Sequence, residues 1–413
     1  MIVRRARAAT LLFATLALAG LAGCAGSPGA GGSNATSGAP SAAPSGPSAG
    51  ALKPPITAAP SPAPTRYLPT PAELDTIYAT TRMHSMSLTD EISTMFMVQV
   101  GGTDPAPMQA YLQANHPGGF LLLGSNVPGS AEALAAQLAG VGLTPGLDPL
   151  ISIDEEGGDV ARLGQDTFPG ADQLKSMPVE ATADAFTQRA ALLDQAGVSV
   201  NFGTVADVTN DPASFIYDRV LGTDPDAASQ RVAASVGAEN GTVFSTLKHF
   251  PGHGETEADS HSSIPTTDLS LDQWQARDAP PFAAGITAGA ELVMFGHLVY
   301  SSVDAAPASL SARWHQVLRD QFEFTGVAVT DDMLMLQDSG QPQYADQAAN
   351  AVQAVAAGND LLLYNSAVDM APLVAAIAAA VQSGQIPQQQ IDASVVRVLT
   401  LQRAAWERSH PGQ

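Results

Sequence analysis

The sequence predicts an α/β fold, a single (β/α)8 barrel of the TIM type, and three observations support this prediction. Eight short runs of apolar residues are nearly continuous rather than alternating, which is typical of parallel strands that are covered on both sides. Ala-rich helical stretches separate these runs, as repeated βα units require. Polar side chains follow the ends of the runs, and in a barrel those ends meet at one mouth.

The predicted elements follow one another in a regular order. The strands are expected over residues 97–100, 119–123, 150–153, 198–202, 245–248, 292–295, 327–330 and 361–364. Helices are expected between them, for example over residues 131–138, 228–239 and 345–357. Asp392 is expected to cap a final helix. The buried face of that helix should comprise residues that recur at helical spacing, namely Val395, Val398, Leu399 and Trp406.

The polar residues at the strand ends locate the functional site. At or just after these ends lie Asp154, Asp207, Lys248, His249, His297, Asp331 and Asn365. A doubly wound open sheet is the alternative fold, but no glycine-rich phosphate-binding fingerprint follows any early strand. Because active sites of (β/α)8 barrels form where the C-terminal strand ends converge, we expect these side chains to surround one site.

Composition limits the classes of function that the chain can have. Of its 413 residues, 45% are apolar, which is enough for a sizeable core. Asp and Glu number 40 against 18 Lys and Arg, and the resulting net charge of −22 repels phosphate backbones. We therefore expect no nucleic-acid partner. A single cysteine, Cys24, excludes an intramolecular disulfide and a cysteine-rich zinc site.

The first residues are typical of an export signal. Arg4, Arg5 and Arg7 precede an apolar run over residues 8–22, which is too short to span a bilayer. The run ends in Leu-Ala-Gly-Cys, which resembles the lipobox of bacterial lipoproteins. This resemblance implies a lipoprotein signal peptide over residues 1–23 and acylation of Cys24; an ordinary signal peptide is the alternative. We expect an exported protein, lipid-anchored to the outer face of the bacterial cell membrane.

A segment of low complexity follows the expected lipidation site. Residues 25–65 are almost wholly Ala, Gly, Ser and Pro, and Lys53 carries their only charge. Such a segment cannot bury enough apolar surface to offset the entropy lost on ordering. We therefore expect a flexible tether over residues 24–69 and one folded domain over residues 70–413.

The most informative segment is KHFPGHGETEADSH at residues 248–261, whose proline and glycines force a loop after a strand. One interpretation is a solvated loop, and a second is a metal site with His249, His253 and His261 as ligands. The third is an acid–base pair of Asp259 and His261. Residues i and i+2 of an extended loop point the same way, so the carboxylate can orient the imidazole for proton transfer.

Two further segments bring acids to the expected barrel mouth. The run GVAVTDDML ends a strand with Asp331 and Asp332, of which only one can face the site, because neighbouring strand residues point to opposite sides. Asp332 is alternatively expected to cap the helix that follows. The run IDEEGG at residues 153–158 places Asp154 before two glycines, which would allow a ligand to approach the backbone closely. With Arg162 nearby, this carboxylate suits vicinal sugar hydroxyls.

Taken in order, these motifs resemble glycoside hydrolase family 3, in its β-N-acetylhexosaminidase branch. That branch has IDxEGG…R, an NFxPVADV-like run, KHFPGHG…DSH, VMxxHxxY, PASLS and TDDxxM. The corresponding runs here cover residues 154–162, 201–208, 248–261, 293–300, 307–311 and 330–333. Two positions depart from the pattern. Asp159 stands where the family often has arginine, and YDRVLG at residues 217–222 matches the usual GDRSFG loosely.

The resemblance implies a retaining exo-β-N-acetylhexosaminidase with a (β/α)8 catalytic domain, no cofactor and no metal. It implies that Asp331 is the nucleophile and that His261, oriented by Asp259, is the general acid/base. The terminal sugar would be bound by Asp154, Arg162, Arg219, Lys248 and His249. The expected carbohydrate substrates are peptidoglycan-derived fragments that end in β-linked N-acetylglucosamine, and we expect a monomer.

Two other functions remain open on the sequence alone. A metal-dependent hydrolase would use the histidine loop, and loss of activity on chelation would favour it. A catalytically inactive, sugar-binding lipoprotein would use the barrel only as a scaffold. Intact Asp331, Asp259 and His261 favour catalysis over the inactive scaffold, because a decayed site should have lost one of them.

Overall fold

The computed structural model describes residues 68–139, 141, 146–254, 256, 260 and 263–412, which belong to one compact unit. The predicted signal peptide, Cys24 and nearly all of the predicted tether lie outside the described residues. The predicted acid–base pair, Asp259 and His261, also lies outside them.

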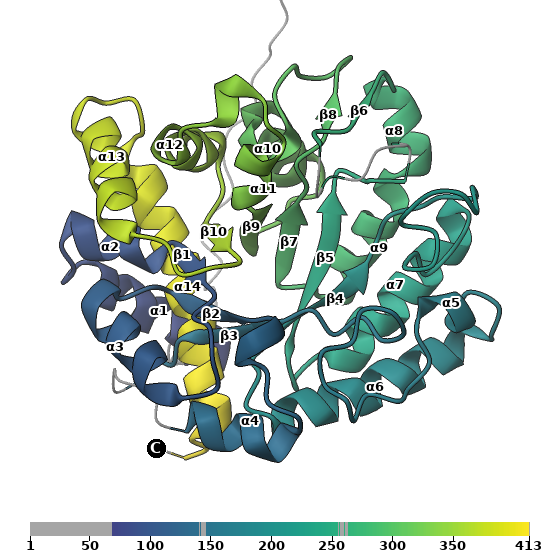
Figure 1. Cartoon of the computed structure of the whole chain (residues 1–413), viewed down its shortest axis with the longest axis horizontal. Coiled ribbons are helices and arrows are strands. Elements are labelled where there is room, and N and C mark those ends of the chain that lie inside the picture. The colour runs from purple at the N-terminus through teal and green to yellow at the C-terminus, as the bar shows by residue number, and fades with distance from the viewer. Residues whose placement is uncertain are drawn as a thin grey trace, which may run out of the picture. The chain divides into compact units, whose positions relative to one another are not determined.

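Within the described residues, eight parallel strands close into a barrel (Figure 1). These strands are β1 (Phe96–Val98), β2 (Gly119–Leu122), β3 (Leu150–Ile153), β4 (Val200–Val205), β5 (Phe244–Phe250), β7 (Leu292–Phe295), β9 (Val327–Asp332) and β10 (Leu361–Tyr364). Around the barrel they follow the order β1, β10, β9, β7, β5, β4, β3, β2. Each strand overlaps one of the apolar runs in the sequence, so the predicted (β/α)8 barrel is confirmed.

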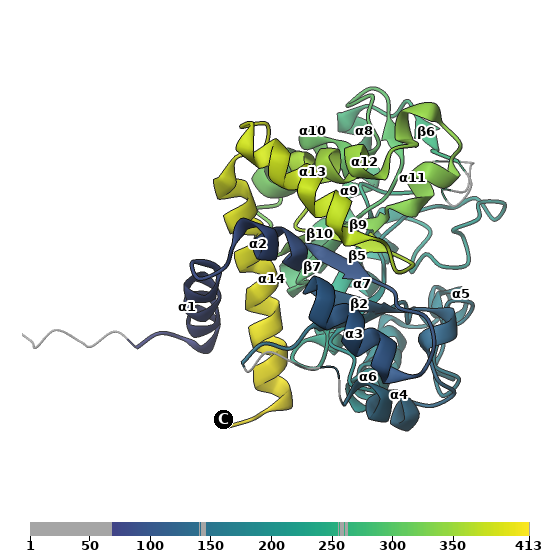
Figure 2. The same cartoon turned by 60° about the vertical axis from the view of Figure 1, so that its left-hand side comes forward.

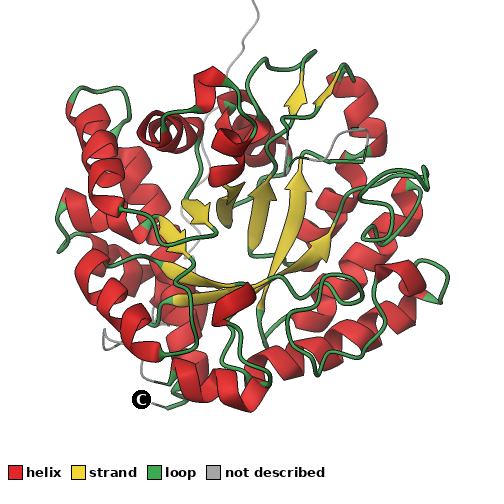
Figure 3. Ribbon diagram, in the orientation of Figure 1, coloured by secondary structure: helices red, strands yellow, loops and turns green. Residues whose placement is uncertain are grey.

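Helices surround the strands on the outside of the barrel (Figure 3). The longer ones are α1 (Pro71–Met83), α3 (Pro105–Asn115), α4 (Ala131–Leu138), α6 (Val179–Gln195), α7 (Pro225–Glu239), α9 (Ala279–Ala288), α12 (Gln347–Ala357), α13 (Met370–Gln382) and α14 (Gln388–Ser409). The shorter elements are α2 (Leu88–Thr94), α5 (Ala171–Leu174), α8 (Leu271–Arg277), α10 (Ala312–Gln316), α11 (Leu334–Asp338), β6 (Thr266–Thr267) and β8 (Val299–Tyr300). The predicted helices over residues 131–138, 228–239 and 345–357 correspond to α4, α7 and α12.

Local sequence explains where several helices begin. Thr70 caps α1, because its hydroxyl accepts the N–H of Glu73 at 3.3 Å and the Glu73 carboxylate accepts the N–H of Thr70 at 2.7 Å. Asp224 and Asp346 cap α7 and α12 through side-chain oxygens that accept N–H groups of the first turn. Such caps satisfy donors that a helix leaves unpaired at its start.

The final helix, α14, begins one turn earlier than predicted. Asp392 is not its cap, so that prediction is wrong: Pro387 occupies the cap position, and Asp392 lies in the second turn. There its carboxylate accepts the side-chain amide of Gln388 at 2.7 Å. Proline has no backbone N–H, so it fits the start of a helix and not its interior. Of the predicted buried face, Val395, Val398 and Leu399 are buried, and Trp406 is half-buried.

One end of the barrel is covered by α14. The first residues of β3, β5, β7, β9 and β10 belong to the same buried apolar cluster as Val398 and Ala405 of that helix. The helix therefore packs across the N-terminal ends of the strands, and α1 packs beside it (Figure 2). The C-terminal ends remain for the functional site. None of the helices in the described part of the chain has the length and apolar character that a membrane span needs.

Candidate active site

A cavity of about 310 Å³ lies at the C-terminal end of the barrel. Its wall contains the described residues that the sequence predicts to act there, namely Asp154, Arg162, Arg219, Lys248, His249 and Asp331. Asn365 also lines the cavity, whereas Asp207 and His297 are fully buried behind it. Small-ligand sites typically have volumes of about 300–1,000 Å³, so the volume of this cavity is near the lower limit. Strand ends that are far apart in the sequence thus meet around a space for a small ligand.

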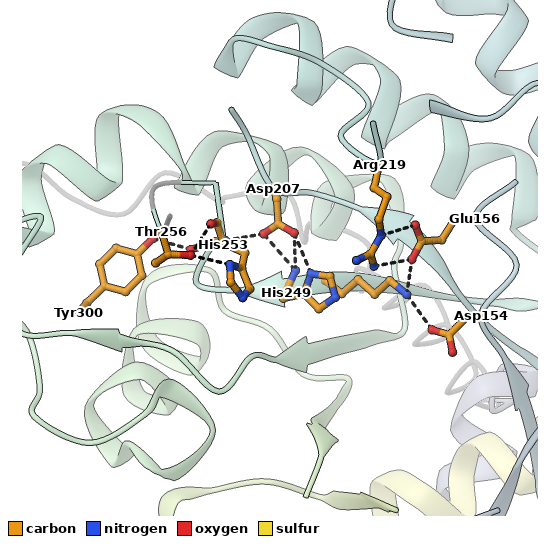
Figure 4. A network of polar contacts seen from close by, with 10 residues as sticks. Asp154, Glu156, Asp207, Arg219, His249, His253, Thr256 and Tyr300 are labelled. Carbon is orange, nitrogen blue, oxygen red and sulfur yellow. Dashed lines mark hydrogen bonds and ion pairs between the residues drawn. The ribbon is translucent and has the colours of Figure 1, made fainter. Parts of the chain in front are cut away.

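Charged side chains form a connected network on one side of this cavity (Figure 4). Lys248, near the end of β5, is buried, and its ammonium contacts Asp154 Oδ1 at 2.8 Å and Glu156 Oε1 at 2.7 Å. Glu156 also accepts two hydrogen bonds of 2.7 and 2.9 Å from the guanidinium of Arg219. Burial opposes ionisation of Glu156, but Lys248 and Arg219 hold its pKa at about 2. Arg162 approaches Asp154 at 3.7 Å.

A second network holds the segment that follows β5. The buried carboxylate of Asp207 accepts the backbone N–H groups of His249 at 3.2 Å and of His253 at 2.6 Å, and it lies 2.8 Å from His249 Nδ1 (Figure 4). His253 Nδ1 contacts Thr256 Oγ1 at 2.6 Å. Burial lowers the pKa of His253 to about 4, so this ring is neutral at pH 7. Asp207 therefore fixes the orientation of His249 at the cavity wall.

The two adjacent acids of β9 have different surroundings. Asp331 is half-buried, and its Oδ1 accepts the N–H of Asp332 at 2.8 Å. Burial alone would raise the pKa of Asp331, but charge interactions with His249, His297 and Lys248 and the hydrogen bond from the backbone of Asp332 outweigh it and lower the pKa. Asp332 accepts the N–H groups of Leu334 and Asn365, both at 3.1 Å, and burial raises its pKa to about 6. Asp331 is thus the more exposed of the two acids and the one whose pKa is lowered, whereas Asp332 holds the start of α11.

The two glycines after the acidic run make room for protein rather than for a ligand. Gly157 and Gly158 have φ values of 85° and 64°, in the left-handed region that favours glycine. A Cβ on Gly157 would overlap the guanidinium of Arg189. That side chain is fully buried and donates to the Asp166 carboxylate at 2.6 Å. The predicted approach of a ligand to this backbone is therefore corrected, because the space at Gly157 belongs to the Arg189–Asp166 pair.

The alternative metal site depends on His249, His253 and His261. In the described part of the chain, no group of three or more His, Cys, Asp or Glu side chains is arranged to hold a metal ion. The rings of His249 and His253 are 6.0 Å apart, and their Nδ1 atoms contact Asp207 and Thr256. His261 lies outside the described residues.

Two residues of the site are not assigned a role by sequence reasoning. Glu156 lies two positions after Asp154, and because residues i and i+2 of an extended segment point to one side, this spacing is a signal for it. Asp207 belongs to the strand-end set, but its contacts with His249 and His253 depend on the packing of β4 beside β5. That packing has no local sequence signal.

Known proteins resemble the chain over most of its folded part. The sequence profile described as "Glycosyl hydrolase family 3 N terminal domain" matches residues 87–401. "Beta-hexosaminidase LpqI" of Mycobacterium tuberculosis is 32% identical over 322 residues, which cover 74% of this chain and 80% of that protein.

Solved structures agree with this relationship. A glycoside hydrolase family 3 beta-N-acetylglucosaminidase from Paenibacillus sp. str. FPU-7 superposes with a TM-score of 0.72 and 28% identity, covering 78% of this chain and 63% of that one. The chain thus spans less than two thirds of the Paenibacillus protein. The M. tuberculosis LpqI structure has a TM-score of 0.70 and 29% identity, covering 78% of this chain and 96% of that one. On the profile match, the sequence identity and the shared barrel, the chain belongs to glycoside hydrolase family 3 and is a glycoside hydrolase.

Proposed function

We propose that the chain is a retaining exo-β-N-acetylhexosaminidase that removes terminal β-linked N-acetylglucosamine. The names of its relatives, beta-hexosaminidase and beta-N-acetylglucosaminidase, support this substrate class. The observation that carries the proposal is Asp331, a carboxylate of lowered pKa in the wall of a cavity rich in hydrogen-bonding charges. The cavity volume of about 310 Å³ favours a single terminal sugar over the interior of a long chain, which supports exo action.

In the proposed reaction, a carboxylate oxygen of Asp331 attacks the anomeric carbon. The glycosidic C–O bond breaks, its electron pair goes to the leaving oxygen, and protonated His261, paired with Asp259, donates a proton there. Water then gives a proton to His261 and attacks the same carbon, which frees Asp331 and restores the original configuration. The first step needs an ionised Asp331, and the lowered pKa of this group supports that requirement.

We propose that the terminal sugar is held by the charged side chains of the cavity wall. Carboxylates accept hydrogen bonds from sugar hydroxyls, and ammonium and guanidinium groups donate to them. Arg162 lines the cavity with a side chain that is 31% exposed, so its guanidinium can reach a hydroxyl. The proposed sugar ligands are Asp154, Arg162, Arg219, Lys248 and His249, all of which line the cavity.

We also propose that the natural substrates are peptidoglycan-derived fragments such as muropeptides. The support is the predicted export signal, lipid anchor at Cys24 and tether, which would hold the domain outside the cell membrane and near the wall. A monomer is sufficient for this role, because the proposed catalytic and sugar-binding residues all come from one chain.

Turnover of chromogenic glycosides tests the proposed activity. The 4-nitrophenyl β-N-acetylglucosaminide should be hydrolysed with a higher kcat/KM than the β-glucoside and the β-xyloside, and NMR should detect the β-anomer as the first product. Faster turnover of the β-glucoside, or first formation of the α-anomer, would contradict the proposal. Release of N-acetylglucosamine from its β-1,4 disaccharide with N-acetylmuramic acid, compared with chitobiose, tests the proposed natural substrate.

A further inference from the structure

We infer that Glu156 is a positioning residue, which holds Lys248 and Arg219 in place for the sugar without binding the sugar itself. The inference rests on the proposed function, in which Lys248 and Arg219 are sugar ligands. Glu156 lies in the loop after β3 and is only 4% exposed. By contrast, the side chain of Asp154 is 21% exposed, so it can meet a ligand directly.

The geometry commits the Glu156 carboxylate to the two cations. Its Oε1 accepts from Arg219 Nη2 at 2.7 Å and its Oε2 accepts from Arg219 Nε at 2.9 Å, while Oε1 also forms an ion pair of 2.7 Å with Lys248 Nζ. Two parallel hydrogen bonds fix the plane of a guanidinium as well as its position. The N–H groups of Arg219 that are directed away from Glu156 therefore have a fixed direction.

Lys248 is oriented by the same carboxylate. Its ammonium donates to Asp154 at 2.8 Å and forms an ion pair of 2.7 Å with Glu156. The two carboxylates therefore hold the ammonium between them and limit the directions that its remaining donors can take toward a ligand. Glu156 thus determines the direction of the remaining donors on both cations at once.

Charge provides a second argument. Lys248 is a buried cation, Arg219 is a partly buried cation beside it, and Glu156 is the acid that contacts both. Burial alone would lower the pKa of Lys248, but Asp154 and Glu156 raise it above its ordinary value despite the nearby guanidinium. Removal of the charge at Glu156 leaves Lys248 with one carboxylate and an unscreened guanidinium, so its ammonium should lose its proton at lower pH.

The chain offers a matched control for this arrangement. Asp360 precedes β10 at the opposite end of the barrel and is fully buried. Its carboxylate contacts Arg319 at 2.7 Å and Arg397 at 3.0 Å, so it too lies between two cations. Asp360→Asn therefore reproduces the loss of a shared buried counter-charge, but far from the cavity.

The test compares Glu156→Gln, Glu156→Asp and Asp360→Asn with the wild type, on the 4-nitrophenyl glycoside that the wild type hydrolyses best. Rates are normalised to the active enzyme titrated with a 2-fluoro sugar. We expect Glu156→Gln to lower kcat/KM about 10- to 100-fold, mainly by raising KM. The reason is that this variant loses the charge-assisted contacts that hold the proposed sugar ligands Lys248 and Arg219. The variant's kcat should fall much less than its kcat/KM, because Glu156 does not contact the reacting atoms.

The other two variants separate positioning from general damage. Asp360→Asn should lower Tm and leave KM unchanged. Glu156→Asp keeps the charge but shortens the reach, so it should raise KM as well. The inference is overturned if Glu156→Gln has the KM of the wild type, or, should that variant not fold, if Glu156→Asp has a wild-type KM. Failure of the wild type to hydrolyse the N-acetylglucosaminide would instead overturn the proposed substrate, because the comparison still runs on the glycoside it does cleave.

Discussion

Glu239, the last residue of α7, should make the stability of the barrel depend on pH. It is fully buried, and its two oxygens accept from Asn201 Nδ2 and Ser245 Oγ, both at 2.6 Å. Burial outweighs these hydrogen bonds and raises the pKa of Glu239 from 4.5 to about 7. We predict that Glu239→Gln removes a large part of the loss of stability that the wild type suffers between pH 5 and pH 8.

The sign and the size follow from the two pKa values. The folded carboxyl group binds its proton more tightly than the unfolded one, so the free energy of unfolding decreases as pH rises from 4.5 to about 7. Each pH unit in this interval corresponds to about 1.4 kcal/mol, so the full loss by pH 8 is on the order of 3 kcal/mol. Glutamine has the same shape and no charge, and its carbonyl can still accept from Asn201.

Urea unfolding, followed by tryptophan fluorescence at pH 5 and pH 8, measures this effect. Asp278 and Glu291 also have raised pKa values, about 7 and about 6, and they too make the stability depend on pH. Both acids are present in the wild type and in the variant, so their contribution to the pH dependence is common to the two proteins. The difference in unfolding free energy between variant and wild type should therefore shift in favour of the variant by roughly 3 kcal/mol from pH 5 to pH 8. A difference that stays constant within about 1 kcal/mol over this range, which is the precision of such extrapolations, would refute the reasoning.

Three predictions concern catalysis and anchoring. Asp331→Ala should reduce turnover by orders of magnitude, whereas Asp332→Asn should reduce it less, because asparagine retains an acceptor for the α11 N–H group. A 2-fluoro sugar should label Asp331, and a label on another residue would contradict the role of Asp331 as nucleophile. His261→Ala should lower hydrolysis of unactivated glycosides about 10²- to 10⁴-fold, yet affect glycosylation by an activated aryl glycoside far less, with Asp259→Asn acting in the same direction. Equal losses on both substrates would contradict the general-acid role. The wild-type protein should enter the detergent phase on phase separation and Cys24→Ala should not, so equal partitioning of the two would rule out lipidation.

Much of the fold is determined by local sequence. Parallel strands that are buried on both faces need continuous apolar runs, and the eight runs coincide with the barrel strands. When the strands close into a barrel, the residues that follow each run come together at the C-terminal end of the barrel. The order of elements therefore also predicts that Asp154, Lys248 and Asp331 line one cavity. The start of α14 is an exception, because both Pro387 and Asp392 are compatible with a helix start and the pattern of buried residues does not choose between them.

The surroundings of individual side chains depend on tertiary structure alone. Strand alternation predicts that only one of Asp331 and Asp332 faces the site, but both line the cavity, and the pKa of each depends on its burial and its neighbours. Gly157 owes its identity to Arg189, which packs against it from α6. Glu156 meets Arg219 from 63 residues away in the chain, and its low pKa exists only because Lys248 and Arg219 are brought there. Hydrogen bonds and charge interactions act over a few ångströms in space, so they are decided by the packing of distant segments and not by the local sequence that builds each strand.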